Sequence, residues 1–104
     1  MAYAFSYDVP GSPQMYAAVK AAIGPTVPVG LTAQLVLQVE SGLRHVMIWN
    51  SRDDWEKFRS ARVEPAVLKV LSSAGIPAPT EAPAITPLQL VDIWIPGTVP
   101  GSQG

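Results

Sequence analysis

The sequence lacks cysteine altogether and contains a single histidine, His45. Without cysteine the chain has no disulfide, no thiolate metal ligand and no cysteine nucleophile. One histidine leaves only carboxylates as further metal ligands, and helix capping explains the Asp53–Asp54 pair better than metal binding does. A glycine-rich phosphate loop and a nucleophile elbow are also missing. We therefore expect neither a metal site nor a bound cofactor.

Charge is scarce as well: charged residues make up 14% of the chain, and the net charge is −1. With no basic block, binding to nucleic acid through phosphate neutralisation is not expected. No apolar run approaches the ~20 residues that span a bilayer, so no membrane segment is expected. The first residues, MAYAFSYDVPG, lack the basic and apolar regions of a signal peptide, which makes the cytoplasm the expected location.

Apolar residues make up 48% of the sequence, and their spacing is most regular from position 43 to position 74. Residues 44–50 are a strand candidate with an apolar centre. Ser51 then offers its hydroxyl as an N-cap, and Asp54 stands three residues later, where a capping-box acid belongs. The positions that follow recur at steps of three and four, which predicts one buried helical face. This face comprises Trp55, Phe58, Arg62, Val63, Ala66, Val67, Val70 and Leu71.

Pro65 interrupts this helix, because proline has no amide hydrogen and clashes with the turn before it. The pattern predicts a kink, or two abutting helices of which the second starts near Glu64 and ends at Gly75.

An alternating strand candidate over residues 2–9 and a helix that starts at Ser12-Pro13 precede this stretch. The helix is expected to bury Met15, Ala18, Val19, Ala22 and Ile23. Residues 31–40 alternate throughout and should pair with 44–50 as a hairpin, with Leu31, Ala33, Leu35, Leu37 and Val39 on one face. A proline-rich connector (76–87) then leads to a last strand candidate, residues 88–95, which is apolar on both faces and so is expected to be covered on both.

The order strand, helix, strand, strand, helix, strand predicts an α+β, ferredoxin-like βαββαβ fold. Four antiparallel strands would form one sheet with both helices on one face, in a single domain over residues 1–96, followed by a flexible tail at 97–104. The other sheet face would stay apolar or mildly polar. Stacking it against the same face of a second copy would cover it, so a homodimer is expected.

The residues Val46-Met47-Ile48-Trp49-Asn50-Ser51, followed by Asp54-Trp55 and Phe58, resemble a signature of the dimeric α+β barrel superfamily, which includes antibiotic-biosynthesis monooxygenase-like proteins. The resemblance implies a homodimer whose sheets form a barrel, with a ligand cavity between sheet and helices in each subunit. Members of the superfamily oxygenate phenolic polyketides without a cofactor, degrade haem, or catalyse isomerisation, cyclisation and decarboxylation, so fold membership does not choose the chemistry.

Haem-degrading members carry an asparagine, a tryptophan and a histidine at places that hold Tyr7, Phe58 and Val67 in this sequence. All three depart from that pattern, and without the histidine the iron has no axial ligand. Haem breakdown by that mechanism is not expected.

Three residues are candidates for catalysis: His45, Tyr7 and Asp92. His45 can act as a general base because its pKa lies near neutrality, or it is simply a solvated or hydrogen-bonded histidine near a strand end. Tyr7 belongs to an aromatic ladder with Tyr3 and Phe5 that could line a cavity or merely pack in the core. Asp92 lies in an apolar context, where a carboxylate either pairs with Arg44, Arg59 or Arg62, possibly across the dimer, or has a raised pKa.

Candidate substrate-binding residues are Tyr3, Trp49, Phe58, Arg59 and Arg62. The two arginines stand three apart on the helix and could bind an anionic substrate at a pocket mouth, or cover its apolar face with their stems. Trp49 is better explained as a core anchor that needs no function. Trp94 would lie in the barrel or at the dimer interface.

Two functions remain open. The first is a small enzyme, a cofactor-free monooxygenase or an isomerase or cyclase, that acts on a hydrophobic aromatic or polyketide-like molecule. The second is a non-catalytic module of the same fold that binds a ligand or assembles with partners. Convergence of Tyr7 and His45 on an enclosed void would favour the enzyme, and a space filled by Met15, Phe58 and Leu71 would favour the module.

Overall fold

A computed structural model describes residues 2–94 of the chain. The chain runs through β1 (Tyr3–Val9), α1 (Pro13–Ile23), β2 (Leu31–Val39), β3 (Gly42–Trp49), α2 (Arg52–Phe58), the π-helical turn η1 (Arg59–Val63), α3 (Glu64–Ser73) and β4 (Thr86–Leu88). All strand pairs are antiparallel, in the order β2-β3-β1-β4. This is the ferredoxin-like α+β fold that the sequence predicts. The single domain over 1–96 stays a prediction, and the tail at 97–104 lies outside the described residues.

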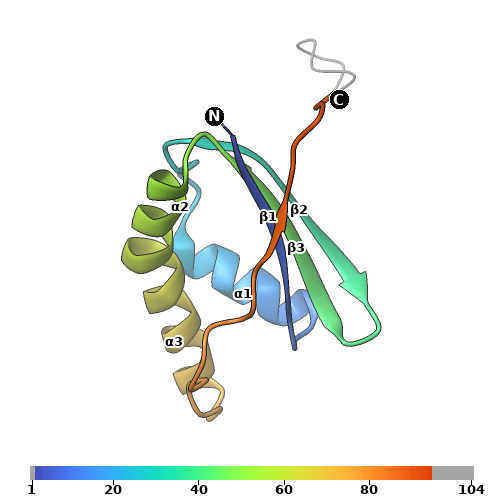
Figure 1. Ribbon diagram of the computed structural model, residues 1–104. Helices are drawn as coiled ribbons and strands as arrows, with labels where there is room; N and C mark the ends of the chain where they lie inside the picture. The colour runs from blue at the N-terminus through green and yellow to red at the C-terminus, as the bar shows by residue number, and fades with distance from the viewer. Residues whose placement is uncertain (1, 95–104) are drawn as a thin grey trace, which may run out of the picture.

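The helices lie on one side of the sheet (Figure 1). Because cross-strand partners share a face, the register defines the residues that this helix face presents. They are Tyr3, Phe5, Tyr7 and Val9 of β1, Leu43, His45, Met47 and Trp49 of β3, and Leu31, Gln34, Val36 and Gln38 of β2. The opposite, open face carries Ala33, Leu35, Leu37, Val46, Ile48 and Leu88, and no helix of residues 2–94 covers it.

The core forms where α2 packs on the helix face. Phe5, Met47, Trp49 and Trp55 are buried together, and Phe58 packs against them from the end of α2. Burying a large apolar side chain contributes roughly 1.5–3 kcal/mol, so these side chains supply a substantial share of the stability of the fold.

Both predicted helix starts are confirmed. The Ser12 hydroxyl accepts a hydrogen bond from the Met15 amide at 3.2 Å, and Ser51 accepts one from Asp54 at 3.1 Å. A second helix also begins at Glu64, as predicted, but the chain does not break there. It passes through the η1 turn, in which the Glu64 amide donates to the carbonyl of Arg59, five residues earlier.

A β-bulge corrects the predicted face of the hairpin. Leu31 pairs with Trp49 and Ala33 pairs with the adjacent residue, Ile48, so β2 contains one extra residue at this point. Leu31 therefore lies on the helix face and packs against the core, whereas Leu35 and Leu37 lie on the open face. Strict alternation placed all three on one side.

The last strand and the first helix also differ from expectation. β4 spans only Thr86–Leu88, and residues 89–94 have no regular secondary structure and are largely exposed, so the strand predicted over 88–95 is wrong in bounds and burial; position 95 lies outside the described residues. Helix α1 has no buried residue: Met15, Val19 and Ile23 are half-buried, and the two alanines of the predicted stripe are exposed. No helix of residues 2–94 has the length and hydropathy to cross a membrane.

Candidate active site

His45 and Tyr7 stand opposite each other on β3 and β1, and both project from the helix face. Their rings are stacked, with centroids 4.7 Å apart and planes 7° from parallel. Tyr16 of α1 approaches His45 edge-on at 5.7 Å, with an interplanar angle of 63°. The sequence left open whether Tyr7 and His45 converge; the structure brings these two residues and Tyr16 together. We call Tyr7, Tyr16 and His45 the histidine cluster.

His45 is the buried titratable group of this cluster, with 8% of its surface exposed. Burial lowers the pKa of its imidazole, and the negative charge of Asp8 opposes this effect without reversing it. Its Nδ1 atom has no hydrogen-bond partner among the described residues. At neutral pH the imidazole is therefore uncharged and can accept a proton. The alternative of a solvated histidine at a strand end does not fit this burial.

The pKa of Tyr7 is raised, whereas that of His45 is lowered. Burial, followed by the neighbouring Tyr16, raises the pKa of its hydroxyl to about 12. The phenol therefore stays protonated at neutral pH and keeps a hydrogen to donate in a hydrogen bond. A neutral base beside a protonated donor is the division of roles expected of an acid–base site.

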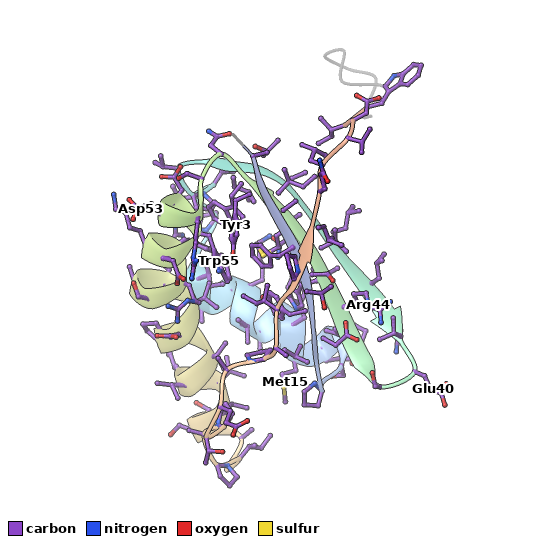
Figure 2. The ribbon with its side chains drawn as sticks, viewed as in Figure 1. Tyr3, Met15, Glu40, Arg44, Asp53 and Trp55 are labelled. Carbon is purple, nitrogen blue, oxygen red and sulfur yellow. The ribbon has the colours of Figure 1, made fainter. Side chains whose placement is uncertain are left out.

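An ion pair lies next to the cluster on the open face. Arg44 donates from Nε and Nη2 to the two carboxylate oxygens of Asp8, at 2.8 and 3.0 Å. The hydrogen bond from Arg44 lowers the pKa of Asp8, and the same bond raises the pKa of the guanidinium. Figure 2 shows Arg44 at the end of the β2–β3 hairpin, close to Glu40. The ion pair keeps Asp8 ionised, and the negative charge of Asp8 acts to raise the pKa of His45.

The predicted aromatic contacts Tyr3, Trp49 and Phe58 belong to the core end of the helix face. Tyr3 pairs with Trp49 across the strands, and its ring lies 5.0 Å from Phe5. Figure 2 shows Tyr3 and Trp55 between α2 and the sheet. The indole nitrogens of Trp49 and Trp55 are buried without a hydrogen-bond partner among the described residues. Their role as ligand contacts stays a prediction.

Both predicted anion-binding arginines have partners within the chain. Arg59 donates to Glu56 and Glu64, which raises its pKa. Arg62 donates to the carbonyls of Ile23 and Thr26, at 2.8 and 3.2 Å, and lies over the Phe58 ring. It thereby caps the C-terminal end of α1, a contact that the sequence did not indicate.

Asp92 is not buried. It lies in the exposed segment after β4 and forms no ion pair with any described residue, and its three expected arginine partners bind Asp8, two glutamates and backbone carbonyls. Trp94, expected in the barrel or an interface, is 86% exposed in the single chain. Asp92 is exposed because the strand predicted to carry it does not form, whereas the barrel or interface position of Trp94 stays a prediction. Within residues 2–94, no three histidine or carboxylate side chains are grouped to hold a metal ion.

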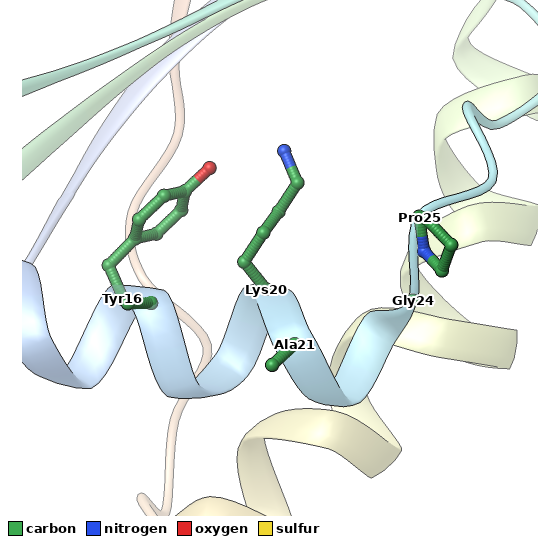
Figure 3. A pocket seen from close by; sticks show the side chains of 6 residues that line it. Tyr16, Lys20, Ala21, Gly24 and Pro25 are labelled. Carbon is green, nitrogen blue, oxygen red and sulfur yellow. The ribbon is translucent and has the colours of Figure 1, made fainter.

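Sequence reasoning missed the open groove beside the cluster. Tyr16, Ala17, Lys20, Ala21, Gly24 and Pro25 line it, with a volume of about 520 Å³ (Figure 3). We call it the α1 groove. Its one sequence signal is the alanine content of α1, which leaves space that larger side chains would fill.

Comparisons with known proteins bear on the fold. No protein-family model and no curated protein matches the sequence. Among solved structures, the chain is similar to Rv0793 from Mycobacterium tuberculosis, with a TM-score of 0.51 and 21% identity over 88% of this chain and 96% of that one. At this identity the likeness extends to the ferredoxin-like α+β fold alone.

Proposed function

We propose that this protein is a small-molecule enzyme of the dimeric α+β barrel type that acts on a hydrophobic aromatic or polyketide-like compound. His45 serves as its general base and Tyr7 as its hydrogen-bond donor. The observation that carries this proposal is the buried His45 imidazole, whose pKa is lowered and whose Nδ1 has no partner. A buried polar atom without a partner is costly to keep, which favours a role in binding or proton transfer.

The reaction begins with a proton transfer. The neutral imidazole removes a proton from an acidic C–H or phenolic O–H of the ligand, which leaves an imidazolium and a delocalised anion. The Tyr7 hydroxyl, protonated because its pKa is about 12, donates a hydrogen bond to the oxygen that gains charge. Return of the proton to another atom of the delocalised anion completes an isomerisation. In a cyclisation the carbanion first adds to a carbonyl carbon of the same molecule, and the imidazolium then protonates the alkoxide that forms. Dioxygen, as a co-substrate that accepts electrons from the anion, would make the enzyme a cofactor-free monooxygenase.

The open face supports a homodimer. Leu35, Leu37 and Leu88 are 58%, 46% and 44% exposed there. An apolar sheet face of this kind is stabilised by stacking against a second sheet. Replacing Leu35 and Leu37 by aspartate should convert a dimer into a monomer in light-scattering measurements, whereas Leu68→Asp, a 49% exposed leucine on α3, should leave it intact. A wild-type protein that is monomeric at micromolar concentration would contradict the dimer.

A non-catalytic module of the same fold is the alternative. The geometry lies between the two arrangements that the sequence left open: the Tyr7 and His45 rings meet, but Tyr16 covers them instead of an enclosed void. The orientation of Tyr16 from α1, a helix without buried residues, favours the enzyme, because its displacement would expose His45.

Anthrone tests the shared first step, since it is a flat neutral aromatic with an acidic C–H. Binding is followed by tryptophan fluorescence in a Trp94→Phe background, where the remaining indoles are the buried Trp49 and Trp55. Deuterium exchange at the acidic carbon, measured by NMR without oxygen, reports the base. His45→Phe should keep binding within a few fold and lower the exchange rate at least about 10²-fold.

Each result separates the hypotheses. Binding without accelerated exchange would identify a ligand-binding module. Exchange that persists in His45→Phe would remove His45 as the base. A urea midpoint close to that of the wild type for this variant ensures that lost exchange reflects chemistry and not unfolding.

A further inference from the structure

The α1 groove combines an apolar floor with one cation. Tyr16 and Lys20 stand one helical turn apart and rise from the same side of α1, with Gly24 and Pro25 beyond the helix end (Figure 3). The remaining lining is alanine. This groove is a shallow depression of about 520 Å³ along one side of α1, widely open to solvent. The groove is open on one side, so a ligand can enter without a change of fold.

Among the cations of the described helices, only Lys20 and Lys69 form neither an ion pair nor a side-chain hydrogen bond with a described residue, and of these two only Lys20 lines the groove. Arg52 and Arg59 pair with glutamates, Lys57 pairs with Asp53, and Arg62 binds backbone carbonyls. Lys20 forms no ion pair with any described residue, and it is the one charged residue of α1. Its ammonium is therefore available to an anion, in a groove whose walls carry no carboxylate.

Tyr16 connects the groove to the catalytic base. The same ring lines the groove and meets His45 edge-on at 5.7 Å. The Tyr16 ring would separate the His45 imidazole from a ligand that lies along Ala17 and Ala21. Rotation of that one side chain joins the groove to the histidine cluster.

We propose that the α1 groove binds aromatic molecules that carry a carboxylate, with Lys20 pairing with the anionic group and Tyr16 contacting the ring. The inference rests on the proposed function and names its substrate class. Arg59 and Arg62, which the sequence offered as anion ligands, have intramolecular partners in the structure, whereas Lys20 does not.

The test compares 1-naphthoate with its neutral counterpart 1-naphthamide. Dissociation constants come from NMR titration of the ¹⁵N-labelled wild-type protein, with the amides of Ala17 and Ala21 as reporters of the groove. We expect naphthoate to bind about three- to fivefold more tightly, the size typical of an exposed ion pair. Lys20→Met should abolish this preference without changing naphthamide binding, and Lys20→Arg should restore it.

Lys69→Met is the matched control, because Lys69 is an exposed lysine of α3 that also forms no ion pair with a described residue. It should keep the preference for naphthoate. A lysine in the last turn of a helix also stabilises it through the helix dipole. If this were the sole role of Lys20, the Lys20→Met variant would lose thermal stability but keep the wild-type ratio of the two dissociation constants. That result would overturn the proposal.

The outcomes separate this inference from the proposed function. Equal affinity of the wild type for the two probes overturns the role of Lys20, while His45-dependent exchange of anthrone leaves the enzyme proposal standing. Shifts at Ala17 and Ala21 that occur only with naphthoate and vanish in Lys20→Met support the groove even where anthrone exchange fails.

Discussion

The two ends of the helix face are closed in different ways. At the core end, Phe5 and Trp49 have no exposed surface and Met47 has 2%. At the other end, the histidine cluster is covered by α1, which has no buried residue. The same three strands run through both ends, so the helix above each end makes the difference.

The covering residues explain the contrast. Helix α2 places Trp55 and Phe58 against the sheet, and their rings lie 5.7 and 5.4 Å from Trp49. Helix α1 supplies Tyr16 and a row of alanines. Two large rings fill the space above the strands, whereas alanines leave a groove. One end thus provides stability, and at the other the Tyr16 ring of a helix without buried residues covers the polar groups of the histidine cluster.

The largest expected effect separates the ends by stability. Trp49→Ala should lower the free energy of unfolding by about 3–5 kcal/mol, because it leaves a large cavity in the closed end. His45→Phe should change it by less than about 1 kcal/mol, because an apolar ring of similar shape replaces a buried imidazole without a partner. Urea denaturation at pH 7.5 measures both.

Trp49→Phe is the control for this comparison. It removes the unpartnered indole nitrogen but keeps an aromatic ring, so its cost should stay well below that of alanine. If Trp49→Ala and His45→Phe destabilise equally, the histidine cluster is part of the core and the contrast between the ends is lost.

The elements and their order were predictable because each rests on a local rule. Ser12 and Ser51 precede helices that they cap, and Pro65 marks the start of α3. The bulge at the start of β2 and the shortness of β4 were not predictable from alternation. Both depend on which partner strand offers hydrogen bonds, and that is a property of the assembled sheet.

The site was predictable only in part. Residue type and strand pattern singled out His45 and Tyr7 as candidates, but their shared face follows from the pairing of β1 with β3, which the sequence did not specify. Tyr16 joins them because of how α1 crosses the sheet, and Arg62 helps to set that position from the η1 turn. An extra residue per turn in η1 changes the direction of every side chain after it, which a regular helical spacing cannot indicate.

Arg62 attaches the C-terminal end of α1 to the η1 turn. Arg62→Ala removes the guanidinium hydrogen bonds to Ile23 and Thr26 at the end of this helix. Losing charge-assisted bonds of this kind should lower the free energy of local opening by about 1–2 kcal/mol, which is about a five- to thirtyfold larger open population. Trypsin cleavage after Lys20, within α1, should accelerate by that factor.

Two controls sharpen this result. Cleavage after Lys57 and Lys69, in α2 and α3, should keep its wild-type rate in the same digest. Arg52→Ala removes an exposed arginine that pairs with Glu56 at 3.7 Å, and should leave the rate at Lys20 unchanged. Acceleration at all three lysines would show that Arg62 stabilises the whole fold, and the two ends would then not open independently.

The smallest effect is the pH dependence that His45 gives to stability. Its pKa in the folded protein lies below the value of about 6.5 in an unfolded chain. Between the two values the unfolded state binds a proton that the folded state does not, so the free energy of unfolding falls as the pH drops below about 6.5. Urea midpoints from pH 8 to 5 should be flat above neutrality and decline below it.

His45→Phe should flatten this decline, because the variant has no histidine. The lowered pKa of Asp8 acts in a separate window: its contribution is present above its ordinary value of 3.8 and is lost only as the pH falls below that. Asp8→Asn should steepen the decline near pH 6, since it removes the negative charge that raises the pKa of His45. A midpoint that rises as the pH falls would mean that the folded protein prefers a charged imidazole. His45 would then be unavailable as a base at neutral pH, and the role proposed for it would be contradicted.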